Sequence, residues 1–169
     1  MPQVLLVVLA LALASQVILQ QSRGGQRTEA VLDGMTIQAA ATAAAVERLD
    51  YLDSLPFDEG VKLTVATAAS SLTPVVNGAF ARTAGLDPAG DDLDDFNGVR
   101  TTVSSVLQQG APAQSLTTAL TVEYVTEAAG VTASAVPTRF KRATVVVTTS
   151  GTAPIRLSRL YSCGGLCAW

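Results

Sequence analysis

The densest group of side chains that could do chemistry is an acidic run between Leu86 and Gly98. Oxygen ligands at this density are typical of Ca²⁺ sites. The EF-hand spacing is not met, because aligning Gly98 with the invariant glycine places Leu93 and Ser104 at the first and last ligand positions. We therefore expect a solvated acidic loop that ends in an Asn-Gly turn. Calcium remains the alternative, with candidate ligands Asp91, Asp92, Asp94 and Asp95.

The only two cysteines, Cys163 and Cys167, lie in the C-terminal sequence YSCGGLCAW. A zinc site would need two further soft ligands, and the chain has no other cysteine and no histidine. A redox pair more typically has C-x-x-C spacing beside a helix. The sequence therefore favours a small disulfide loop, which is typical of an exported protein.

Signals of catalysis and of nucleic-acid binding are absent from the sequence. Histidine, the commonest general base, does not occur, and neither does a G-x-S-x-G, G-x-G-x-x-G or P-loop pattern. The basic residues are dispersed: residues 1–95 carry 5 basic and 12 acidic side chains, and residues 96–169 carry 6 and 2. We therefore expect no enzyme, no cofactor and no nucleic-acid partner.

The N-terminal segment MPQVLLVVLALALASQVILQQSRGG is strongly apolar. Between Val4 and Leu19 only Ser15 and Gln16 are polar. A secretory signal would need a basic start, and the sequence begins Met-Pro-Gln, so a cleaved signal is disfavoured. The apolar length just reaches the ~20 residues of a membrane-spanning helix. We expect residues 1–22 to form a helix that is buried in lipid or against copies of itself.

A second helical pattern follows the pair Gly24-Gly25. Over residues 28–55, residues recur at spacings of three and four, as on one face of a helix: Val31, Met35, Ala39, Thr42, Val46, Leu49 and Leu52. Pro56 ends the pattern, since proline disfavours helical geometry in the residue before it. Each glycine costs a helix ~1 kcal/mol relative to alanine, so residues 23–27 are predicted to form a non-helical joint.

After a loop-rich segment over residues 56–98, the pattern becomes one of β-strands. Four segments rich in β-branched residues, VRTTVSSVL, SLTTALTVEYVTE, RFKRATVVVTTS and APIRLSRLYS, are separated by turn residues. They predict an antiparallel meander that buries Leu120, Val122 and Tyr124 against the amphipathic helix. The expected fold class is α+β, with the sheet and the disulfide-stapled tail in residues 99–169.

An apolar helix followed by an amphipathic helix and a C-terminal sheet resembles a type IV pilin or pilin-like subunit. The segments ERLDYLDSLPFDEG and DDLDDFNG are also similar to segments of minor-pilin-like proteins. The resemblance implies a structural subunit of an extracellular filament, with copies of itself and the pilus assembly machinery as partners and the inner membrane as its location before assembly. The implied assembly residues are Val4, Leu5, Leu6, Leu9, Leu13, Val17 and Ile18.

Two features leave alternatives open. In assembled pilins a segment near the position of Gly24 and Gly25 often melts, so the joint is either a plain linker or such a segment. Pilins usually carry glutamate at the fifth mature position, where this chain has Leu5. The chain is then either a shaft subunit or a minor tip subunit or pseudopilin. A membrane-anchored binding domain is the remaining alternative, but it does not explain the amphipathic helix that follows at once.

Overall fold

The computed structural model describes the backbone of residues 2–61, 65–76, 79–80, 90–106, 113–126 and 131–169. The chain divides into two compact units, Met1–Ala39 and Ala40–Trp169, and each is described by itself. The secondary structure is a mixture of helix and antiparallel sheet, as the α+β prediction requires.

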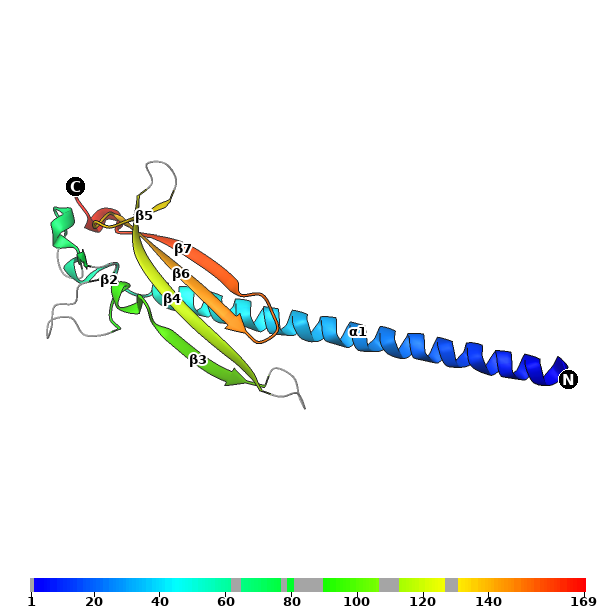
Figure 1. Cartoon of the computed structure of the whole chain (residues 1–169). Coiled ribbons are helices and arrows are strands. Elements are labelled where there is room, and N and C mark those ends of the chain that lie inside the picture. The colour runs from blue at the N-terminus through cyan, green and yellow to red at the C-terminus, as the bar shows by residue number, and fades with distance from the viewer. Residues whose placement is uncertain (1, 62–64, 77–78, 81–89, 107–112, 127–130) are drawn as a thin grey trace. The chain divides into compact units, whose positions relative to one another are not determined.

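The first unit is formed by helix α1 (Pro2–Asp53) as far as Ala39 (Figure 1). The helix continues through Gly24 and Gly25, so the non-helical joint predicted at residues 23–27 is not present in this structure. Long runs of helix-forming residues on both sides offset the cost of two glycines, because helix propagation is cooperative.

Only part of this unit has described side chains. Those of Val4, Leu5, Leu6, Leu9, Leu13 and Val17 lie outside the described set, whereas Ile18 is exposed. In the part of the chain open to description, no helix carries an apolar stretch of the length that crossing a membrane demands.

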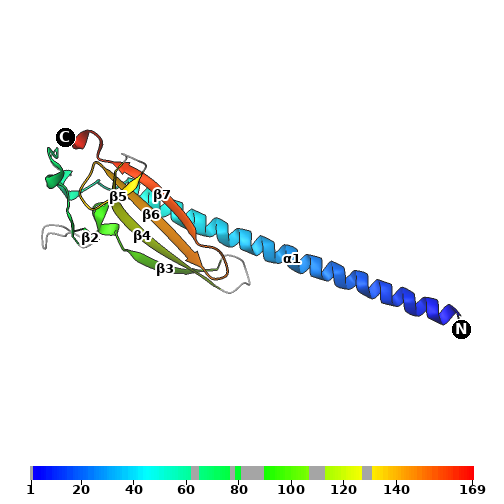
Figure 2. The ribbon, with the colours of Figure 1, turned by 45° about the horizontal axis from the view of Figure 1, so that its top comes forward.

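The second unit is built on a sheet whose strands run in the order β3-β4-β6-β7, all antiparallel (Figure 2). The bounds are β3 (Arg100–Ser105), β4 (Gln114–Thr126), β6 (Phe140–Thr149) and β7 (Ile155–Ser162). The four predicted strands and their meander are confirmed. A fifth strand, β5 (Thr132–Ser134), lies where turn residues were predicted. It pairs with residues 124–126 of β4, whereas β3 pairs with residues 114–119 of the same strand.

Residues 40–53 of α1 pack on one face of this sheet (Figures 1 and 2). The buried helix residues are Ala41, Ala45, Leu49 and Leu52, and they join Leu120 and Val122 of β4 in one core. The helix face predicted over residues 28–55 is therefore confirmed at Leu49 and Leu52 but wrong at Val31, Met35 and Val46, which are exposed. Ala41 and Ala45 are buried in the core instead.

Residues 56–98 connect the helix to the sheet through short elements. These are the 3₁₀ helices η1 (Glu59–Val61), η2 (Ala69–Ser71) and η3 (Asp94–Phe96), and the antiparallel pair β1 (Val75–Val76) and β2 (Ala79–Phe80). At the end of the segment Gly98 has a φ of +80°, and its N–H donates to the carbonyl of Leu120 at 3.0 Å. The Asn-Gly pair thus makes the turn into β3 that was predicted.

The C-terminal tail is held in two ways. Cys163 and Cys167 are buried and form a disulfide, with η4 (Gly164–Leu166) between them. Ala66 pairs with the tail, donating to the carbonyl of Leu166 and accepting from the N–H of Ala168, each at 2.9 Å.

Because the disulfide closes a very short loop, its effect on stability is expected to be small. Replacing both cysteines with serine should lower the free energy of unfolding by about 2 kcal/mol or less. Urea denaturation of the double variant and of the reduced wild-type chain measures this, and the two should agree. A loss above about 4 kcal/mol would mean that the tail depends on the disulfide rather than on its pairing with Ala66.

Candidate functional site

Lys141 is fully buried in the second unit, at the centre of a cluster of polar groups. It lies on β6 on the same face as Ala143, Val145 and Val147, which belong to the core. Its ammonium donates to the carbonyl oxygen of Phe57 at 2.6 Å, to Oδ2 of Asp58 at 3.0 Å and to Oδ1 of Asp94. These three acceptors match the three donors of a lysine side chain.

Two separate segments supply the carboxylates. Asp58 follows the end of α1, and Asp94 begins η3. The segments are joined by a backbone hydrogen bond from Leu93 to the carbonyl of Pro56 at 3.2 Å. Asp92 strengthens the junction, since its Oδ2 accepts from the N–H of Glu59 at 2.8 Å while its Oδ1 accepts from the N–H of Asp94 at 2.9 Å. The loop-rich segment is thereby fixed over Lys141.

Aromatic rings enclose the ammonium. The Lys141 Nζ lies 4.4 Å from the ring centroid of Phe57, 4.8 Å from that of Tyr124 and 5.3 Å from that of Phe80. At such distances the π-face of a ring attracts a cation. The rings of Phe80 and Tyr124 also meet edge to face, with centroids 5.3 Å apart.

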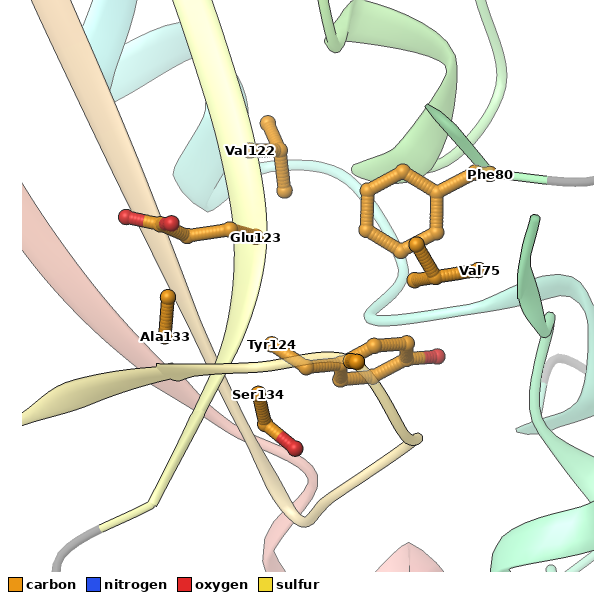
Figure 3. A pocket seen from close by; sticks show the side chains of 8 residues that line it. Val75, Phe80, Val122, Glu123, Tyr124, Ala133 and Ser134 are labelled. Atoms are coloured by element: carbon orange, nitrogen blue, oxygen red, sulfur yellow. The ribbon is translucent and has the colours of Figure 1, made fainter. Parts of the chain in front are cut away.

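The outer side of these two rings borders an open pocket of about 450 Å³ (Figure 3). Figure 3 shows Val75 and Phe80 of the β1–β2 pair facing Tyr124 of β4. The lining is mostly apolar and comprises Val75, Phe80, Val122, Glu123, Tyr124, Ala133, Ser134 and Ala135. Phe80 and Tyr124 therefore contact Lys141 and also line the pocket.

The two carboxylates that contact Lys141 have different surroundings. Asp58 accepts from the backbone N–H of Thr73 at 3.0 Å and from the hydroxyl of Tyr124 at 2.8 Å, and such donors favour the ionised form. Asp94 has no comparable set of donors. Its Oδ2 is buried and accepts no hydrogen bond from any residue that the structure describes.

Burial raises the pKa of Asp94 to about 8, although the charge of Lys141 opposes the shift, and the nearby charge of Asp58 raises it further. Burial likewise raises the pKa of Asp92. The pKa of Tyr124 is raised by burial and then by the charge of Asp58, so Tyr124 remains a hydroxyl donor. The cluster therefore favours a proton on Asp94.

The expectation of a solvated acidic loop is wrong for Asp92, Asp94 and Asp95, which are buried. Their oxygens are used inside the protein: those of Asp92 and Asp95 accept backbone N–H groups, and Asp94 contacts Lys141.

The calcium alternative involves a different set of residues from the one expected. Single carboxylate oxygens of Glu59, Asp91 and Asp92 lie within 4.8 Å of one another, whereas Asp94 turns toward Lys141. Calcium takes six to eight oxygen ligands. Three neighbouring acids do not by themselves identify a calcium site.

Sequence reasoning missed Lys141, Asp58 and Tyr124 as members of one cluster. A signal for Lys141 was present, because alternation along RFKRATVVVTTS places it on the same face as Ala143 and Val145. A lysine on a buried face is rarely found without a paired charge. No pattern in the sequence indicates that residues 58 and 94 supply that charge.

No family model, curated protein or solved structure matches this chain.

Tyr124→Phe should lower the free energy of unfolding by about 1–3 kcal/mol, since it removes a buried donor from a charged acceptor. The hydroxyl lies 2.8 Å from Asp58 and 3.1 Å from the carbonyl of Thr73. Tyr161→Phe is the matched control, because that half-buried hydroxyl lies 3.1 Å from the backbone carbonyl of Leu49 and its carboxylate partner, Asp53, is solvent-exposed. Urea denaturation should give the smaller loss for the control, and the reverse order would contradict the roles assigned here.

Proposed function

We propose that this chain is a structural subunit of a pilus-like helical filament on the cell surface, assembled through the N-terminal part of α1. The observation that carries the proposal is the exposure of large apolar side chains along that helix, namely Ile18, Leu19, Val31, Leu32 and Met35. Exposed patches of large apolar side chains mark interaction sites in proteins. The apolar sequence from Val4 to Val17 extends the same helix.

The arrangement of the second unit supports the same proposal. In a pilin-like fold the N-terminal helix packs its C-terminal half on an antiparallel sheet, and here residues 40–53 of α1 join the core of the sheet. The helix would then serve two purposes, anchoring the globular unit at one end and joining neighbouring copies at the other.

Close packing between helices, more than the hydrophobic effect, would favour the assembled filament over the membrane-inserted subunit. Before assembly the N-terminal segment would lie in the inner membrane, and the pilus assembly machinery would transfer it to the filament. A segment that leaves lipid gains little from apolar burial, so close helix contacts have to favour the assembled state. Ala10, Ala12 and Ala14 are small enough to allow such contacts.

The experiment is negative-stain electron microscopy of material sheared from the native cell surface, combined with mass spectrometry of the fibres. Uniform fibres that contain this chain are the expected result, and antibody labelling along the fibre or at its end separates a shaft from a tip subunit. If the chain stays in the membrane fraction and no fibre contains it, the proposal fails. A membrane-anchored binding domain would then be the better explanation.

A further inference from the structure

We propose that Lys141 and Asp94 become joined by an intramolecular amide bond, with the carboxylate of Asp58 acting as the proton relay. The amine contacts Oδ1 of Asp94 and lies 3.0 Å from Oδ2 of Asp58. All three side chains are buried, and the rings of Phe57, Phe80 and Tyr124 enclose the amine. This inference does not depend on the filament proposal.

The reaction starts from an amine and a carboxylic acid, which a proton transfer from Lys141 to the contacting Asp94 supplies. Moving a proton from the ammonium to Asp94 replaces a buried ion pair with an amine and a carboxylic acid, and an apolar interior penalises neutral groups far less than charges. Asp94 can hold the proton on Oδ2, which accepts no hydrogen bond within the described part of the chain. The N–H of Thr73 and the hydroxyl of Tyr124 donate to Asp58 and hold its carboxyl group beside the amine.

The reaction is a condensation that balances without any co-reactant. The lone pair of the Lys141 nitrogen attacks the carboxyl carbon of Asp94, and the new C–N bond forms. Oδ2 of Asp58 takes a proton from that nitrogen and delivers it to the departing hydroxyl group. The C–O bond then breaks, one water molecule leaves, and Asp58 returns to its starting state.

Two features of the site favour this reaction over a lasting ion pair. The fold holds amine and carboxyl in contact, and reactions between groups held in this way reach effective concentrations far above those in solution. The aromatic enclosure also limits access of water, which would otherwise favour hydrolysis. The product would tie η3 to β6 across a sequence separation of 47 residues.

The test is mass spectrometry of the full chain after denaturation and reduction. The expected mass is lower than that of the sequence by one water, about 18 Da. Trypsin should release a branched peptide in which residues 83–100 are joined to residues 140–142, because it does not cleave after an acylated Lys141. A wild-type chain that yields residues 83–100 as a free peptide overturns the proposal.

Variants test the assignment to individual residues. The chain has two lysines, so Lys62→Arg is the matched control and should still lose one water, whereas Lys141→Arg and Asp94→Ala should not. Loss of water in Lys141→Arg or Asp94→Ala would overturn the assignment. Asp58→Asn retains Lys141 and Asp94 but removes the proton relay. We expect most of this purified variant to have the mass of its sequence, with no water lost. Complete loss of one water in Asp58→Asn would contradict the role of Asp58 as proton relay.

Discussion

Lys141→Met is expected to lower the free energy of unfolding by at least about 3 kcal/mol. The substitution nearly conserves side-chain length but leaves the buried side chains of Asp58 and Asp94 without the nitrogen that both contact. It also removes the donor to the carbonyl of Phe57. Urea denaturation followed by the fluorescence of Trp169, the single tryptophan, provides the measurement.

Arg142→Met is the matched control for this substitution. Arg142 is the next residue of β6 and faces the other side of the sheet, where it pairs with Glu123 at an exposed fraction of about one third for each side chain. Its loss should cost about 0–1 kcal/mol, because partly solvated ion pairs contribute little. Equal losses for the two variants would contradict a special role for the buried cluster.

The second large effect concerns assembly: Leu13→Asp is expected to abolish filaments. A charged side chain costs about 2.5–3.5 kcal/mol at the centre of a bilayer, so Leu13→Asp would disfavour the membrane-inserted subunit, and an apolar filament core penalises the same charge. Leu9→Asp should act in the same way. The measurement is the yield of sheared fibres, counted by electron microscopy and related to the amount of subunit in the cells.

Two controls separate loss of assembly from loss of folding. Thr121→Asp places the same charge on an exposed position of β4 and should leave fibres intact. Deletion of residues 1–27 should leave the second unit folded, as judged by near-ultraviolet circular dichroism, because the sheet and its helix residues 40–53 are retained. Fibres of Leu13→Asp at wild-type yield would contradict assembly through the apolar helix.

The four longer strands could be predicted because each is a run of β-branched residues bounded by turn residues. The face of β4 that carries Leu120 and Val122 followed from alternation alone. Tyr124 is buried as predicted, and its contacts with Phe80, Asp58 and Lys141 were not predicted. Strand β5 could not be anticipated, since three residues carry too little pattern and pair only because β4 extends beyond β3.

The helix face and the acidic run were predicted incorrectly for a shared physical reason. Hydropathy ranks Val31 and Met35 above Ala41 and Ala45, but in α1 the core of the second unit includes Ala41 and Ala45, while Val31 and Met35 are exposed. Hydropathy also places aspartates in solvent, whereas Asp92, Asp94 and Asp95 are buried. Asp94 contacts Lys141, which is distant in sequence, and the other two accept hydrogen bonds from backbone N–H groups of nearby residues. In both cases the outcome depends on tertiary contacts that no local pattern encodes.

The position of Lys141 near the end of the chain has a consequence for biosynthesis. Asp58 and Asp94 are translated well before the lysine that balances them, so a nascent chain has to keep both carboxylates in water until β6 emerges. The sheet is also built from pairings that need β6, which lies between β4 and β7. Folding of the second unit is therefore delayed until most of the chain has been made, and truncated products that end before residue 141 should remain unfolded substrates for proteases.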